Sequence, residues 1–364
     1  MIEVVSRSDD AVTVSVGGHE LSLTHRWIRD HSEDPTSLEP TTLQREVDTF
    51  ALPSDLAAAD VAVEGDELVV RWVDHPEPSR CSERLLRVMA GVEGVLIASP
   101  WASGSAFDPT RHECADVMSD DRALLSVLDA IVSDGTAVLS GIEPTEAAAT
   151  ALAERVGRVR HTVFGSMWRV ASDVVDHLDS AYATTYLEPH TDATYMTDAP
   201  GTQLFCCVER SGTGGESILV DGFAAAEDLR RDAPEHFETL TTVVVPARYV
   251  EPGVHLRAER PAIRLGPDGT IRQVSFNNYD RAPFWLPEPR MSAFYEAYAA
   301  LHDLITDESR WFVLRLEPGD AVLFDNWRVL HGRNGYTGSR AFHGCYHDRD
   351  EILSRRRVLA ASAS

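Results

Sequence analysis

Apolar and polar residues alternate in two segments near the N-terminus. Residues 12–16 read Val-Thr-Val-Ser-Val, and the alternation continues over residues 19–23 after Gly17-Gly18. It returns over residues 62–72, around the pair Gly65-Asp66. Alternation with period two predicts half-buried strands, and a glycine-containing pair between two such runs predicts a hairpin turn. We therefore predict a small β-rich domain over residues 1–95.

Three later segments space their apolar residues at intervals of three and four. They cover residues 121–132, 145–156 and 292–305, and this spacing predicts helices. A short apolar run at residues 136–139 follows Asp134-Gly135 and predicts a strand. A stretch rich in proline, serine and glycine at residues 99–105 precedes all of them. From it we predict a linker over residues 96–115 and a second domain over residues 116–364.

Short apolar runs and glycine-rich turns fill much of the second domain. Residues 204–207 lead to Gly-Thr-Gly-Gly at residues 212–215 and then to an apolar run at residues 218–220. Another apolar run, residues 321–324, follows a Pro-Gly-Asp turn. Such runs predict buried strands. Helices packed on a mostly antiparallel double-stranded β-helix, the jelly-roll or cupin-like architecture, account for all these segments, so the predicted class is α+β to mainly β.

Composition excludes several classes of protein. Hydrophobic residues make up 43% of the 364 residues, enough for a sizeable core. The formal net charge of −25 argues against a nucleic-acid partner, because a phosphate backbone would be repelled. No apolar run approaches the length of a membrane span, and no basic segment precedes an apolar one at the N-terminus, so we expect neither a membrane span nor a signal peptide. Five cysteines without a paired framework fit a reducing cytoplasm.

The leading candidate for chemistry is the trio His190-Thr191-Asp192 together with the distant His331. Two imidazoles and one carboxylate form the facial ligand set of non-haem Fe(II), which leaves coordination positions open for a cosubstrate and O2. If the trio forms a strand, alternation points His190 and Asp192 to the same face. An isolated pair with this spacing also arises by chance. Here the pair and His331 both adjoin predicted strands, which favours ligands that line one barrel mouth.

Arg340 follows His331 closely in the sequence. A guanidinium on the same side of a barrel can hold the far carboxylate of 2-oxoglutarate through paired hydrogen bonds. The order of these residues predicts a 2-oxoglutarate-dependent iron oxygenase, with Fe(II) on His190, Asp192 and His331. We expect such an enzyme to hydroxylate an unactivated C–H bond, with O2 as second cosubstrate and with release of succinate and CO2.

Many short motifs occur in one order along the second domain. They are residues 167–168, 179–182, 190–195, 212–215, 220–223, 277–282, 325–333, 344–346 and 349–350. With these motifs, the chain from about Leu124 to its end resembles the gamma-butyrobetaine hydroxylase and trimethyllysine dioxygenase family, and more closely the trimethyllysine enzyme. The resemblance implies a small, quaternary-ammonium amino acid or betaine as substrate. Relatives in this family act on other small molecules, so a different amine, amino acid or phosphonate of secondary metabolism is the alternative.

The resemblance also implies how the substrate is held. At the positions of the family's aromatic cage for a trimethylammonium group, this chain has Phe164, Trp168, Tyr182 and Tyr346. Ring faces bind a cation that cannot donate hydrogen bonds, and Asp179 would add a counter-charge. Phe164 stands where the family usually has tyrosine. The alternative interpretation is that these aromatic residues belong to the core.

The other polar candidates concern the far end of the substrate and the cosubstrate. An amide of Asn277 or Asn278 can donate to a substrate carboxylate, and only one of them faces inward if the segment is a strand. Ser217 matches a hydroxyl position that helps to hold the cosubstrate in related oxygenases. It fits equally well as a strand serine that satisfies a neighbouring backbone group.

The N-terminal domain departs from the family. There, three cysteines and a later histidine usually bind zinc, and the domain contributes to a homodimer. Here the matching stretch, residues 31–37, has no cysteine, and His75 would stand alone at the histidine position. Because a structural zinc site needs four nitrogen or sulfur ligands, we predict that this domain holds no zinc.

Two interpretations from other classes remain. One is a cupin-like sensor that binds iron without turnover, and it would release no succinate from 2-oxoglutarate. The other is a partner-assembly role of the N-terminal domain, whose deletion would abolish an interaction and leave decarboxylation intact. Neither explains the position of Arg340 as well as an oxygenase does.

Overall fold

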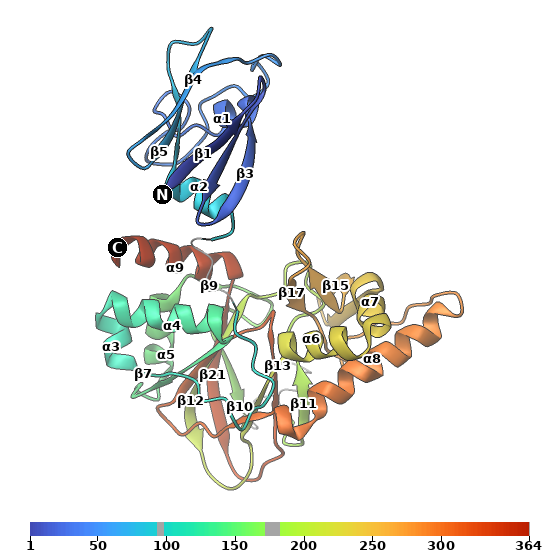
Figure 1. Cartoon of the computed structure of the whole chain (residues 1–364). Helices are drawn as coiled ribbons and strands as arrows, with labels where there is room; N and C mark the ends of the chain where they lie inside the picture. The colour runs from blue at the N-terminus through green and yellow to red at the C-terminus, as the bar shows by residue number, and fades with distance from the viewer. Residues whose placement is uncertain (93–97, 172–182, 364) are drawn as a thin grey trace. The chain divides into compact units, whose positions relative to one another are not determined.

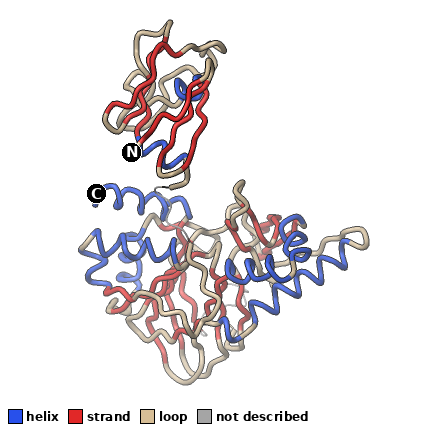
Figure 2. Tube along the Cα trace, in the orientation of Figure 1, coloured by secondary structure: helices blue, strands red, loops and turns tan. Residues whose placement is uncertain are grey.

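The computed structural model describes residues 1–92, 98–171 and 183–363. Contacts divide the chain into two compact units, Met1–Leu96 and Ile97–Ser364, each with its own core. Figure 1 follows the chain from blue at the N-terminus to red at the C-terminus, and Figure 2 separates helices from strands.

The first unit consists of two three-stranded antiparallel sheets and two short helices around a core of valine, leucine and isoleucine. Its elements are β1 (Ile2–Arg7), β2 (Ala11–Val16), β3 (His19–Thr24), α1 (His25–Asp30), β4 (Ala58–Glu64), β5 (Glu67–Trp72), β6 (Ser79–Ser82) and α2 (Glu83–Met89). Both predicted hairpins are confirmed. Gly17 and Gly18 at positive φ join β2 to β3, and Gly65 at positive φ joins β4 to β5.

Two mainly antiparallel sheets face each other in the second unit and form its barrel. The seven-stranded sheet contains β7 (Arg111–Glu113), β8 (Thr136–Ser140), β9 (Val159–Arg160), β10 (Trp168–Ala171), β12 (Thr202–Arg210), β19 (Ala321–Asp325) and β21 (Arg340–His347). The four-stranded sheet contains β11 (Leu187–His190), β13 (Ser217–Asp221), β18 (Phe312–Leu314) and β20 (Val329–Arg333). Two hairpin pairs lie beside them, β14 (Val244–Glu251) with β15 (Val254–Pro261), and β16 (Ile263–Leu265) with β17 (Ile271–Val274).

The barrel interior is filled by side chains from both sheets. Val322, Phe324 and Phe342 from the large sheet meet Leu219 and Val329 from the small one in a single cluster. Strand alternation separates the inner from the outer face. On β12, for example, Phe205 and Cys207 face this interior, whereas Leu204 and Cys206 pack under the covering helices. This is the double-stranded β-helix that the sequence predicted.

Helices cover both outer faces of the barrel (Figure 1). The large sheet packs against α3 (Cys114–Ser119), α4 (Asp121–Ser133), α5 (Glu146–Val156) and α9 (Arg349–Ala363). The small sheet packs against α6 (Gly222–Asp232), α7 (Pro234–Thr242) and α8 (Arg290–Thr306), with a 3-10 turn, η2 (Glu308–Arg310), after α8. The three predicted helices are confirmed as α4, α5 and α8. Within the described ranges, none of the helices combines the length and the apolar character that a membrane crossing requires.

In the segment that we predicted to be a linker, the described residues 98–115 are largely packed within the second unit. The Trp101 ring stacks on Phe107 with centroids 4.3 Å apart, and Trp101 Nε1 donates to the Asp134 carbonyl oxygen at 2.9 Å. Residues 111–113 form β7, which pairs in parallel with β8. The composition of this segment is typical of a linker, but its aromatic side chains Trp101 and Phe107 are packed in the barrel cluster, and burial of their apolar surface stabilises the packed segment.

Candidate active site

The two candidate histidines are direct partners across one pair of strands. His190 is the last residue of β11, and His331 lies at the centre of β20. Because they are paired in this antiparallel ladder, their side chains leave the sheet on the same face, with ring centroids 4.5 Å apart. Gly332 lets the strands approach, since a Cβ there would lie 2.6 Å from the Leu187 carbonyl oxygen.

Asp192 lies beyond the end of β11, so strand alternation is not what orients its carboxylate. Its backbone is held by Asn326. Asn326 Oδ1 accepts from the Asp192 N–H at 2.8 Å, and Nδ2 donates to the Asp192 carbonyl oxygen at 3.1 Å. Ala193 follows with φ 57°, a left-handed conformation that is uncommon for a residue with a Cβ. This turn and the amide clamp direct the chain so that the Asp192 carboxylate lies beside the histidines.

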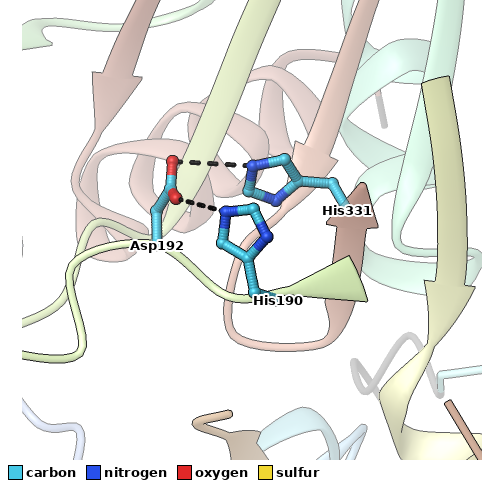
Figure 3. Close-up of side chains that lie close together, drawn as sticks. All are labelled: His190, Asp192 and His331. Carbon is cyan, nitrogen blue, oxygen red and sulfur yellow. Dashed lines mark ion pairs between the residues drawn. The ribbon is translucent and has the colours of Figure 1, made fainter. Parts of the chain in front are cut away.

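The three side chains converge on one point (Figure 3). Asp192 Oδ1 lies 3.2 Å from His190 Nε2, and Asp192 Oδ2 lies 3.6 Å from His331 Nε2. One ligand atom from each residue lies within 4.8 Å of the others. Throughout the described part of the chain, this is the only such group of three or more histidine, cysteine or acidic side chains.

Hydrogen bonding around His190 favours a cation at this point. His190 Nδ1 lies 2.8 Å from the Glu188 carbonyl oxygen, which can only accept, so Nδ1 carries a proton. Nε2 then directs its lone pair at an Asp192 oxygen 3.2 Å away. Two acceptors at this distance repel each other unless a proton or a metal ion lies between them. Two imidazoles and a carboxylate suit Fe(II), so the donor set fits that metal.

The protonation states also suit metal binding. Burial, reinforced by His190, lowers the pKa of His331 to about 4 despite the opposing effect of Asp192, so the imidazole is neutral and keeps a lone pair. Burial alone would raise the pKa of Asp192. His331, His190 and the Tyr346 hydroxyl outweigh it and hold this pKa well below its usual range. The site therefore presents an anionic carboxylate at neutral pH.

A cavity adjoins the three side chains and encloses about 1040 Å³ of space, its open mouth included. Arg340 reaches it from the start of β21. Its Nε donates to the Gly215 carbonyl oxygen at 3.1 Å, and its guanidinium lies 4.0 Å from the centroid of Phe342. Burial, together with Arg333, lowers the pKa of Arg340 to about 9, which leaves it charged at neutral pH. It has no carboxylate within 4.0 Å among the described residues, and a buried cation of this kind calls for an anionic ligand.

Aromatic side chains form another part of the cavity wall. Phe164, Trp168 and Tyr346 all line it. The Trp168 ring lies 5.4 Å from that of Tyr346, and Phe164 lies 5.5 Å from Tyr249, centroid to centroid. Two further residues assigned to the cage by resemblance, Asp179 and Tyr182, lie outside the described residues.

The two asparagines lie in different surroundings, and their segment is a turn after β17 rather than a strand. Asn277 lines the cavity, where its Nδ2 donates to Asp280 at 3.1 Å and its Oδ1 accepts from the Tyr279 N–H at 2.9 Å. Asn278 is not among the cavity-lining residues, and its Oδ1 accepts from Arg281 at 3.2 Å. Ser217 lines the cavity from the first position of β13.

Three cavity or support residues escaped the sequence reasoning. Asn326 lies in the motif that contains His331, but its partner Asp192 is remote in the sequence. Asp280 lines the cavity and accepts from Thr194 Oγ1 at 2.9 Å. Gln203 is 1% exposed and also lines the cavity, and its Oε1 has no hydrogen-bond partner among the described residues. A glutamine in an otherwise apolar strand run is the signal that could have identified Gln203.

In the first unit, a guanidinium lies beside the residues at the positions of the family's zinc ligands. Arg29 Nη2 lies 3.2 Å from His75 Nε2, and Arg29 Nη1 donates to Ser37 and lies 3.9 Å from Asp34. His75 Nε2 must accept from this cation, so its lone pair is not free for a metal. The residues present do not fit zinc.

Comparisons with known proteins agree with this geometry. The family described as "Taurine catabolism dioxygenase TauD, TfdA family" matches residues 102–346. The chain is 31% identical over 348 residues to a mitochondrial trimethyllysine dioxygenase of Gallus gallus, and the match covers 93% of this chain and 83% of that protein. It is 33% identical over 347 residues to a gamma-butyrobetaine dioxygenase of Pseudomonas sp., with 92% and 89% covered. A crystal structure of a putative alpha-ketoglutarate-dependent taurine dioxygenase from Burkholderia xenovorans matches with a TM-score of 0.52 at 16% identity, over 68% of this chain and 91% of that one, which shows the shared fold.

Proposed function

The chain belongs to the TauD, TfdA dioxygenase family and is an Fe(II)- and 2-oxoglutarate-dependent dioxygenase, and from this premise we propose that it hydroxylates a small quaternary-ammonium amino acid or betaine. The observation that carries the proposal is one cavity that joins three elements. These are a His-Asp-His cluster, an arginine with no carboxylate partner among the described residues, and an aromatic wall. Each element fits a different component of the reaction.

His190, Asp192 and His331 hold the iron. Together, bound iron, 2-oxoglutarate and O2 supply the oxidising power that replaces a C–H bond with C–OH, with release of succinate and CO2. The residues themselves keep the metal in place: the paired strands fix both imidazoles, Glu188 orients His190, and Asn326 fixes Asp192. Three protein ligands leave the remaining positions to the cosubstrate and O2.

Arg340 binds the distal carboxylate of 2-oxoglutarate. Its guanidinium remains charged in a buried position, with Phe342 beneath it, and a carboxylate would neutralise it. Ser217, which lines the same cavity, adds a hydroxyl donor for this ligand.

The substrate cation lies against Phe164, Trp168 and Tyr346. Each ring face contributes about 0.5–2 kcal/mol to the binding of a desolvated cation. Asn277 positions the opposite end of the substrate through its amide, already oriented by Asp280 and the Tyr279 N–H. The substrates named for the relatives, trimethyllysine and gamma-butyrobetaine, both match this division into a cationic and a polar end.

The test is a succinate-release screen with trimethyllysine, gamma-butyrobetaine, trimethylaminoethylphosphonate and their unmethylated forms. We expect a methylated compound to give the highest kcat/KM. Trp168→Ala should lose this turnover and retain uncoupled decarboxylation of 2-oxoglutarate, whereas Trp285→Ala, whose side chain is 77% exposed, should match the wild type. A neutral or unmethylated best substrate would exclude the cage. Iron binding without any succinate release would favour a sensor instead.

We also propose that the protein is a cytoplasmic homodimer. The family resemblance supports the dimer, and the five cysteines, all buried and unpaired, support a reducing compartment. Light scattering during size exclusion measures the first property, and subcellular fractionation of the source cells measures the second. A mass of 40.1 kDa in solution would exclude the dimer.

A further inference from the structure

Tyr346 contacts the metal cluster as well as the cavity. Its ring lies on the cavity wall beside Trp168, and its hydroxyl donates to Asp192 Oδ2 at 2.7 Å. An O–H donor to an ionised carboxylate at this distance is a charge-assisted hydrogen bond, about twice as strong as a neutral one. Tyr346 is 7% exposed, so little water competes for this bond.

Neighbouring strands fix the position of the hydroxyl. Tyr346 is paired with Gln203 on β12 and with Arg160 on β9. Trp168 packs against the Tyr346 ring and is itself seated over Gly344 of the same strand. The hydroxyl therefore approaches Asp192 from a direction that the barrel sets, independently of any metal.

The two Asp192 oxygens have different surroundings. Oδ2 accepts from Tyr346 and lies 3.6 Å from His331 Nε2, whereas Oδ1 lies 3.2 Å from His190 Nε2. Two neighbouring octahedral ligand atoms, each about 2.1 Å from one metal, lie about 3 Å apart. The 3.2 Å between Asp192 Oδ1 and His190 Nε2 therefore fits two atoms that bind the same metal ion. The Tyr346 hydrogen bond favours metal binding through Oδ1 alone, because it occupies one lone pair of Oδ2 and fixes the rotation of the carboxylate.

We propose that Tyr346 is a positioning residue that holds the Asp192 carboxylate in single-oxygen coordination and so keeps a metal position open for the cosubstrate or O2. The inference rests on the proposed metal site and deepens it. Without the hydroxyl, Oδ2 is free to turn toward the metal and occupy an additional position. The aromatic ring serves the substrate and the hydroxyl serves the metal ligand, so one side chain joins the two regions.

Tyr346→Phe separates these roles, because it removes the hydroxyl and keeps the ring. The experiment measures Mn(II) binding to the apo-protein by electron paramagnetic resonance, and the absorption spectrum of the Co(II) form. We expect Tyr346→Phe to weaken Mn(II) binding by about 10–100-fold, as for other residues that orient metal ligands. We also expect its Co(II) spectrum to show a higher coordination number.

Two controls decide between the possible outcomes. Tyr298→Phe is the matched variant, a buried tyrosine on α8 whose ring stacks on Phe276 at 4.6 Å and does not line the cavity, and it should bind Mn(II) as the wild type does. Asp192→Ala tests the metal site itself. If Asp192→Ala abolishes binding while Tyr346→Phe stays within about twofold of the wild type with an unchanged Co(II) spectrum, the positioning role is wrong and the metal site stands. If Asp192→Ala has no effect, the metal site is wrong.

Discussion

Gly344→Ala should disable the substrate end of the cavity and leave the metal cluster intact. Gly344 on β21 is the strand partner of Trp168 on β10. A Cβ at this position would lie 2.1 Å from two carbon atoms of the indole ring. Because carbon atoms in contact stay about 3.5–4.0 Å apart, the ring or its strand must move by roughly 1.5 Å.

This displacement allows the loss of activity to be estimated. A misplacement of about 1 Å at a reacting centre can cost about a hundredfold in rate, so we expect kcat/KM for the substrate to fall by about 100-fold or more. Overpacking of this kind also destabilises a protein by about 1–3 kcal/mol. The Mn(II) affinity of the apo-protein should fall less than in Tyr346→Phe, because His190, Asp192 and His331 lie outside the contact and the Tyr346 hydroxyl is retained.

The assay compares substrate-dependent succinate release with substrate-independent decarboxylation. Gly335→Ala is the matched control, because a Cβ there meets its nearest neighbour at 3.4 Å, an ordinary contact. We expect this control to retain both activities. If Gly344→Ala keeps kcat/KM within about threefold of the control, Trp168 does not bind the substrate and the reasoning is refuted.

Three further predictions concern the cosubstrate, the response to pH and the first unit. Arg340→Leu should raise the KM for 2-oxoglutarate by about 100-fold or more. Thermal stability should not fall, because the substitution removes a buried charge that has no carboxylate partner among the described residues. A lowered melting temperature with an unchanged KM would show that Arg340 has a structural role instead. Burial lowers the pKa of His347, whose Nε2 donates to the Ala153 carbonyl oxygen at 2.9 Å. Because the unfolded chain therefore binds a proton at this residue more readily than the folded one, the free energy of unfolding decreases as the pH falls below about 6.5. In urea unfolding between pH 7 and 5, His347→Gln should therefore reduce the slope of unfolding free energy against pH by up to about 1.4 kcal/mol per pH unit. An unchanged slope would exclude His347 as the source of this pH dependence. Arg29→Met should destabilise the first unit by about 3 kcal/mol or more, because it leaves Asp34, Ser37 and His75 buried or half-buried without their cationic partner. Hydrogen exchange of residues 1–92 can measure this loss of stability. Protection from exchange that depends on added zinc would contradict this interpretation.

Local patterns in the sequence predicted the architecture and several of its elements. Hairpin turns at Gly17-Gly18 and Gly65, and the helices α4, α5 and α8, depend on residues close together in the chain, so periodicity and turn chemistry suffice to locate them. Packing of residues 96–115 was beyond such reasoning. Whether Trp101 and Phe107 are buried depends on a surface built by strands that come later in the chain.

The candidate site divides in the same way. The motifs around His190 and His331 indicated the ligand types, and the structure brings these residues together. What orients them is nonlocal: Asn326 clamps Asp192, and the Tyr346 hydroxyl reaches it from another sheet. A sequence pattern cannot show such hydrogen bonds, because it does not specify which strands become neighbours.

One strand, β21, brings the parts of the proposed reaction into a fixed relation. Alternation points Arg340, Phe342, Gly344 and Tyr346 to the inner face, while Cys345 and His347 pack outward under the helices. The proposed anchor for 2-oxoglutarate, the glycine beneath Trp168 and the hydroxyl that donates to Asp192 therefore keep constant spacing along a single backbone. A shift of this strand by one residue would turn all of them away from the cavity at once. By contrast, Phe164 and Asn277 line the cavity from loops outside β21, so a substitution at either position leaves the spacing of the β21 residues unchanged.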